Sequence, residues 1–314
     1  MTSEKSKERP LVSFDWALKR LLRNKANHEV VEGFLSELLS RPVTIKSVLE
    51  SESNREHPGD KHNRADVVVE DDRGEIILIE LQFILEMDYF QRMLYGASKA
   101  AVERMVQGDR YMEIKKIYSI NIVYFDLGHG KDYVYLGRTD FRGMHDHEIL
   151  KLSKEQHRIF GKIEAGDLYP EYYILKINNF NDVAQTTLDE WIYFLKHDRI
   201  RADFSARGLL KARDILDYSR LSPEEKADYD YEQSVKSHNL SQIASAKETG
   251  KSEVEAKYSK TLEEKDRAIE EKGKVIEEKE KALEEKDRAL EEKGKALEEK
   301  DREIEALKRL LSIK

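Results

Sequence analysis

Hydrophobic residues between positions 11 and 40 recur at spacings of three and four. This spacing predicts helices with one buried face, because such residues lie on the same side of a helix. We expect Asn24 to Asn27 to separate two helices as a turn, and Pro42 to help end the second one. A short edge strand is expected at residues 43–49, followed by a polar loop.

The next segment predicts a hairpin. The run from Ile76 to Ile79 has no polar alternation, which is typical of a central strand covered on both faces. A polar turn from Asp71 to Gly74 would join it to the strand that Asp66 opens, and Asp66 would then lie roughly opposite Glu80. Side chains alternate along a strand, so Glu80 and Gln82 are expected on one face.

Further elements follow the hairpin. The pattern predicts a long helix at 86–107, strands at 117–125, 133–136 and 168–178, and then mainly helices, one of them capped by Ser222. This order predicts an α/β fold, a mixed sheet flanked by helices.

A different pattern begins near residue 250. One aliphatic residue recurs every seven positions from Leu262 to Leu311, but the second apolar position of a coiled-coil heptad is polar. Oppositely charged pairs such as Glu263 with Arg267 support the helix itself. We predict a long, solvated, heptad-repeat helix that forms a weak homo-oligomer through residues 262–311.

Composition divides the chain. Of its 314 residues 38% are charged, with the excess in the last sixty-odd. We therefore expect a disordered N-terminus at 1–10, a core at 11–180, a helical region at 181–248 and a charged coiled-coil-like helix at 249–314. The net charge of −8 argues against a surface coated in positive charge for nucleic acid, although not against a local basic cleft.

Several classes of function are disfavoured. There is no cysteine, so disulfides and thiolate metal sites are excluded, which fits a cytoplasmic protein. No stretch approaches the roughly 20 apolar residues of a membrane helix, so we expect no membrane span. Neither a phosphate-binding P-loop nor a dinucleotide glycine fingerprint occurs, and no organic cofactor is expected.

The hairpin also carries candidate chemistry. Two carboxylates held as close as Asp66 and Glu80 repel each other unless a cation lies between them. Hard oxygen ligands favour Mg²⁺, Mn²⁺ or Ca²⁺. Gln82 would add a neutral ligand or a group that positions water. The competing interpretation is an ordinary carboxylate pair near a strand turn.

These residues resemble a known family. Asp66, a strand and turn, and then Glu80-Leu-Gln82 resemble the PD-(D/E)XK nuclease motif in the variant where glutamine replaces lysine. Asp15-Trp-Ala-Leu-Lys19 resembles the opening helix of the Rpn family of recombination-promoting nucleases and transposases. Over roughly residues 12–255 the order of motifs is similar, the others being Arg92-x-x-Tyr95, Gly108-Asp-Arg-Tyr111, Trp191-Ile-Tyr-Phe-Leu-Lys196, the Leu221-Ser-Pro-Glu-Glu segment and Ala246-Lys-Glu-Thr-Gly250.

The resemblance implies a restriction-endonuclease-like core and metal-dependent cleavage of DNA. Asp66, Glu80 and the backbone carbonyl of Leu81 would hold the metal, and Asp15 would be a further acidic ligand through water. Gln82 completes the implied catalytic set.

Lys19 and Arg92 could contact phosphate. Their competing interpretation is a salt bridge to nearby acids.

Two functions remain open at this point. The first is a metal-dependent DNA endonuclease associated with recombination, mobile elements or defence. The second is a catalytically weak or inactive nuclease-like module that binds DNA or protein and assembles through its C-terminal helix. Gln82 favours the second function, because it cannot supply the positive charge of the motif lysine.

Overall fold

A computed structural model describes residues 11–49, 67–103, 105 and 109–311 of the chain. The chain divides into two units, Met1–Val235 and Lys236–Lys314. The predicted segment boundaries at residues 180 and 248 stay predictions.

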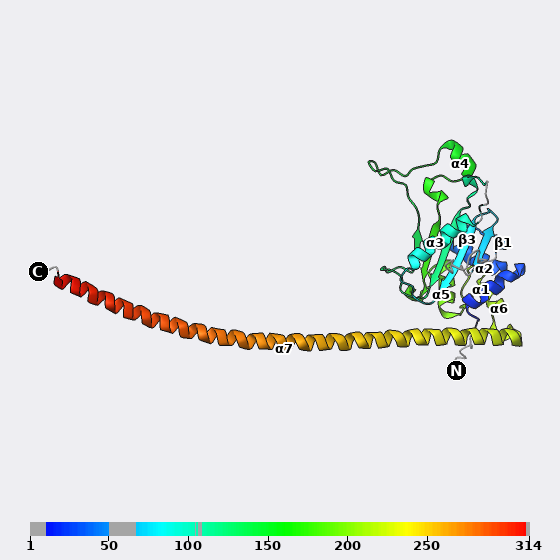
Figure 1. Ribbon diagram of the computed structural model, residues 1–314. Helices are drawn as coiled ribbons and strands as arrows, with labels where there is room; N and C mark the ends of the chain where they lie inside the picture. The colour runs from blue at the N-terminus through cyan, green and yellow to red at the C-terminus, as the bar shows by residue number, and fades with distance from the viewer. Residues whose placement is uncertain (1–10, 50–66, 104, 106–108, 312–314) are drawn as a thin grey trace. The chain divides into compact units, whose positions relative to one another are not determined.

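The first unit contains a mixed six-stranded sheet in the order β1-β2-β3-β4-β6-β5 (Figure 1). Strands β3, β4 and β6 run parallel, while β1, β2 and β5 pair antiparallel with their neighbours. The strands are β1 Ile45–Leu49, β2 Val67–Asp71, β3 Ile76–Gln82, β4 Ile117–Val123, β5 Val134–Gly137 and β6 Glu171–Lys176. The predicted mixed sheet, with residues 45–49 at its edge, is confirmed.

Strand β3 lies in the middle of the sheet, and its first six residues are buried. This confirms the central strand that the unbroken apolar run predicts. The preceding turn is also confirmed, since Gly74 N–H donates to the carbonyl of Asp71 at 3.0 Å and Gly74 has the positive φ that favours glycine. The register pairs Val67 with Ile79. These two residues are the neighbours in sequence of Asp66 and Glu80.

Helices cover both faces of the sheet (Figure 1). Alternate residues of β3, among them Ile77 and Ile79, share one core with the first, second, fifth and sixth helices. The other face, including Ile76 and Leu78, packs against the third helix. Among the described residues, the α-helices that lie wholly within this unit are α1 Phe14–Arg23, α2 His28–Leu38, α3 Tyr89–Val102, α4 Lys154–Phe160, α5 Thr187–His197 and α6 Leu209–Ile215.

Aromatic rings join early and late parts of the chain in the larger core. Phe14 of α1 contacts Phe34 of α2 edge-on at 5.9 Å between ring centroids, and Trp191 of α5 at 6.1 Å. Such pairs each contribute about 0.5–1.5 kcal/mol beyond the burial of their area. These contacts connect α5 to the same core as the two N-terminal helices.

One predicted helix begins later than expected, and one helix was not predicted. Helix α3 begins at Tyr89, three residues after the predicted start, because residues 83–88 form a loop in which the Glu86 side chain bonds to Gln82 and Arg92. The sequence pattern also missed α4. Its start carries a capping box between Ser153 and Gln156, a signal that the sequence does contain.

Helix α7 spans Pro223–Leu311, so the predicted long C-terminal helix is present. Ser222 caps it as predicted, since its hydroxyl accepts from Glu225 N–H at 3.2 Å and the Glu225 carboxylate accepts from Ser222 N–H at 2.8 Å. Among the described residues, no helix combines the length and the apolarity that crossing a membrane requires. Assembly through the heptad repeat stays a prediction.

Candidate nuclease site

The candidate site lies at the carboxyl end of β3. Glu80 and Gln82 point to one face of the sheet, the face that α3 covers. Glu80 is 9% exposed, while Gln82 is half-buried at the strand's last position. A carboxylate at this depth is costly to bury unless a cation compensates its charge.

Arg92 of α3 supplies such a cation. Its Nη2 forms an ion pair with Glu80 Oε1. Its Nη1 donates to both carboxylate oxygens of Glu86, at 2.7 Å and 2.9 Å. Burial opposes the charge on Arg92, but the carboxylates of Glu80 and Glu86 outweigh it and raise the pKa of the guanidinium above its ordinary value.

Gln82 belongs to the same cluster. Its Nε2 donates to Glu86 Oε1 at 3.0 Å and to the carbonyl of Ile84 at 3.2 Å. Both partners only accept hydrogen bonds, which fixes the amide nitrogen on their side and leaves the amide oxygen facing away from them. Sequence reasoning missed Glu86, although its position four residues after Gln82 is visible in the sequence.

Asp15 lies in the first turn of α1 and is half-buried. Burial raises the pKa of Tyr124 well above its ordinary value, and the nearby negative charges of Asp15 and Asp198 add to this effect. Tyr124 N–H donates to the carbonyl of Gln82 at 3.0 Å. The carboxylate of Asp15, at the start of α1, is therefore close enough to influence the ionisation of Tyr124. The backbone of Tyr124 is in turn bonded to Gln82, at the end of β3.

The remaining predicted residues divide into two groups. Leu81 is buried and its side chain packs in the larger core, on the face opposite to Glu80. Asp66 lies outside the described residues. Lys19 lies on α1, but its side chain is outside what the structure describes. Of the predicted set, Glu80, Gln82 and Arg92 are brought into one cluster.

The donor chemistry of this cluster suits a hard cation. The Glu80 carboxylate and the Gln82 amide oxygen are the oxygen ligands that Mg²⁺, Mn²⁺ and Ca²⁺ prefer. Within residues 11–49, 67–103, 105 and 109–311, no group of three or more His, Cys, Asp or Glu is placed to hold a metal ion.

A family model described as PD-(D/E)XK nuclease family transposase matches residues 12–246. The chain belongs to this family. The resemblance drawn from the motifs is thereby confirmed, and the six-stranded mixed sheet with flanking helices fits the family's α/β fold. Comparison with curated proteins and with solved structures gave no match.

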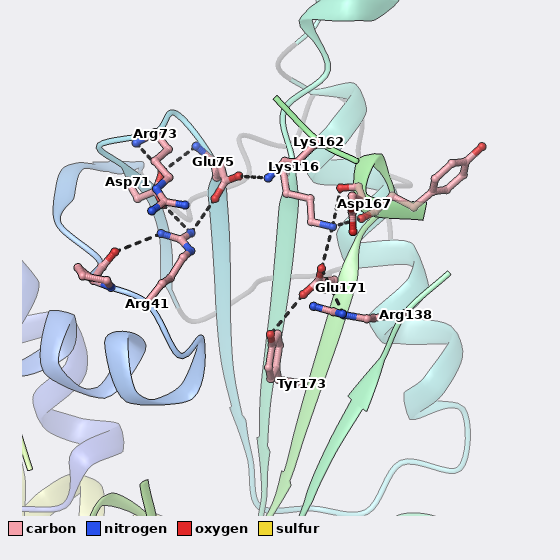
Figure 2. A network of polar contacts seen from close by, with 12 residues as sticks. Arg41, Asp71, Arg73, Glu75, Lys116, Arg138, Lys162, Asp167, Glu171 and Tyr173 are labelled. Carbon is pink, nitrogen blue, oxygen red and sulfur yellow. Dashed lines mark hydrogen bonds and ion pairs between the residues drawn. The ribbon is translucent and has the colours of Figure 1, made fainter. Parts of the chain in front are cut away.

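A second polar cluster lies at the amino ends of the parallel strands of this family member (Figure 2). Arg41 Nη2 donates to Asp71 Oδ2 at 2.8 Å and to Glu75 Oε2 at 2.7 Å, and Lys162 Nζ donates to Glu75 Oε1 at 2.7 Å. At about 3.3 Å per residue along β3, this cluster is roughly 20 Å from Gln82.

Next to it, Lys116 Nζ bonds Glu171 Oε1 at 3.1 Å and the carbonyls of Asp167 and Tyr169 at 2.8 Å and 2.6 Å. Figure 2 shows Arg138 and Tyr173 converging on the same Glu171 carboxylate. Sequence reasoning assigned no role to Lys116, Arg138 and Glu171, because their partners come from distant parts of the chain.

Proposed function

We propose that this nuclease-family protein hydrolyses DNA phosphodiester bonds with the help of a divalent metal. The observation that carries the proposal is the pairing of buried Glu80 with Arg92 at the end of a central strand, beside Gln82. Membership of the nuclease family supports DNA as the substrate.

In this proposal Asp66, Glu80 and the carbonyl of Leu81 hold the metal, and Asp15 contributes through water. A bound Mg²⁺ or Mn²⁺ would lower the pKa of a water and stabilise the negative charge that develops on the phosphate. The oxygen of Gln82 accepts a hydrogen bond from the attacking water and so orients it. It carries no charge, unlike the lysine of the parent motif.

In the same proposal, Lys19 and Arg92 bind the phosphate. The guanidinium of Arg92 can donate a charge-assisted hydrogen bond to a phosphate oxygen through Nη2. Glu86 keeps this guanidinium at the end of β3.

Nicking of supercoiled plasmid DNA tests the function. The wild-type protein and Asp66→Ala are compared with Mg²⁺, Mn²⁺, Ca²⁺ or a chelator. We expect nicking by the wild type with Mg²⁺ or Mn²⁺, none with the chelator, and loss of nicking in Asp66→Ala. Equal nicking by both proteins would reject the site, and no nicking by the wild type with any metal would reject the activity.

A second candidate function is a nuclease-like binding module that assembles through α7. The aliphatic heptad positions on this helix support it, because they are widely exposed, for example Ile269 at 67% and Leu290 at 66%. Exposed apolar side chains in a regular row favour contact with another helix.

Sedimentation velocity of the full chain tests assembly. Replacing Leu283 and Leu290 together by lysine should shift an associated species to the monomer, because both changes place charge in the apolar row. The matched control replaces Glu284 and Glu291 by lysine, off that row. An unchanged sedimentation coefficient in the leucine variant would reject self-association through this row.

A further inference from the structure

Arg92 is shared between two carboxylates of different origin. Glu80 comes from the rigid centre of the sheet and has an 11% exposed side chain, whereas Glu86 comes from the loop before α3 and is 34% exposed. One terminal nitrogen of the guanidinium faces Glu80, and the other bonds both oxygens of Glu86. Loss of the contact to Glu80 would therefore leave Arg92 held on Glu86.

A carboxylate that carries a guanidinium is a poor ligand for a second cation. The two positive charges would repel each other at close range, and the guanidinium would occupy a carboxylate oxygen that the metal needs. Oε1 of Glu80 therefore becomes available to a divalent ion when Arg92 withdraws from it. Withdrawal costs little if another carboxylate already holds most of the guanidinium's hydrogen bonds.

We propose that Arg92 is an internal counter-ion that leaves Glu80 when a divalent metal binds, and that Glu86 is the positioning residue that retains the displaced guanidinium. This inference rests on the proposed metal-dependent function. After withdrawal, Nη2 of Arg92 faces the metal-binding end of β3 and can donate to a phosphate oxygen. The positive charge that Gln82 lacks is then supplied from α3.

Glu86 has a second positioning task in the same cluster. Its carboxylate accepts a hydrogen bond from the amide nitrogen of Gln82, and this bond turns the amide oxygen of Gln82 away from the loop. One carboxylate therefore orients both the residue that carries positive charge and the residue that faces the attacking water. Glu86 is a positioning residue because it acts through Arg92 and Gln82.

Mn²⁺ binding to the full-length protein, measured by calorimetry without DNA, tests the inference. Arg92→Gln should bind Mn²⁺ about tenfold more tightly than the wild type, because the competing cation is gone. Glu86→Gln should bind it about tenfold more weakly, because Arg92 then loses the carboxylate that would retain it away from Glu80. The double variant should return to the affinity of Arg92→Gln, since Glu86 acts through Arg92.

Glu103→Gln is the matched control. Glu103 also pairs with a cation of α3, Lys99 at 3.3 Å, and its side chain is 51% exposed. Its Mn²⁺ affinity should equal that of the wild type. Circular dichroism of every variant verifies that the fold is retained.

The outcomes separate this inference from the proposed function. If the Mn²⁺ affinities follow the predicted order but the wild type does not nick plasmid DNA, the counter-ion role of Arg92 is supported and the nuclease activity is rejected. Wild-type nicking with equal Mn²⁺ affinities in all variants would support the nuclease and overturn the counter-ion. Tighter Mn²⁺ binding in Glu86→Gln would also overturn it, and a wild type that neither binds Mn²⁺ nor nicks DNA would reject both.

Discussion

The two ends of the central sheet contain the same kinds of side chain in different arrangements. At the amino ends of the strands, Asp71 is fully buried. Its carboxylate accepts hydrogen bonds from two backbone N–H groups of its own turn and from the side chain of Arg41. At the carboxyl end, one guanidinium is divided between Glu80 and Glu86.

This difference separates a structural network from a candidate site. In the first cluster each carboxylate has partners from several elements, so a change in one contact leaves the others in place. In the second, one guanidinium contacts two carboxylates, and in our proposal a ligand alters that balance. We therefore expect mutations at the amino end to affect stability and mutations at the carboxyl end to affect chemistry.

The largest expected effect is on stability at the amino end. Asp71→Ala should lower the free energy of unfolding by about 3–5 kcal/mol. The change removes a buried ion pair with Arg41 and two hydrogen bonds within the turn. Urea denaturation measures this change. The control Asp72→Ala removes an exposed acid of the same turn and should change stability by about 0.5 kcal/mol or less. Wild-type stability in Asp71→Ala would break the comparison.

The next effect is on activity at the carboxyl end. Glu80→Gln should slow plasmid nicking about 100- to 1,000-fold, because it removes a charged ligand of the proposed metal site. Stability should change by about 1 kcal/mol or less, since Arg92 keeps its bonds to Glu86. The control Glu70→Gln changes an acid of β2 that lies on the same face of the sheet as Glu80, and this variant should nick DNA at the wild-type rate. If Glu80→Gln were strongly destabilised, the carboxyl end would also have a structural role, which would contradict the comparison.

A pH series sharpens the comparison further. Burial, together with Glu171, raises the pKa of Tyr173 to about 12, so folding favours the neutral phenol. The resulting stability is complete below about pH 10, the phenol's ordinary pKa, and is lost as the pH rises through about 12. Tyr173→Phe should reduce this loss by about 1–3 kcal/mol in urea denaturation between pH 9 and 12. The same slope in both proteins would contradict the assignment.

The smallest effect is expected at the edge of the structural network. Lys162→Met should lower stability by about 1 kcal/mol or less, because Glu75 retains Arg41 and the lysine is partly exposed. Lys46→Met, which breaks a more exposed pair with Glu70, should cost less still. Urea denaturation of the two variants gives the order. Nicking should continue at the wild-type rate in both.

Local patterns in the sequence predicted most of the elements. The apolar run of β3, the turn before it and the cap at Ser222 each depend on residues within one turn or hairpin, so periodicity and turn chemistry suffice. The shared face of Glu80 and Gln82 follows from strand alternation alone. These motifs also led to the family to which the chain belongs.

The tertiary structure decided which charges meet. Arg41 reaches Asp71 across 30 positions, and Lys162 reaches Glu75 across 87, because the sheet brings these segments together. The loop after β3 likewise turns Glu86 toward Arg92. Sequence by itself determined most of the elements, the pairing within the hairpin and the family, since these depend on local periodicity and motif order. Ion pairs form only where packing fixes the distance between distant side chains, and that information lies in the fold.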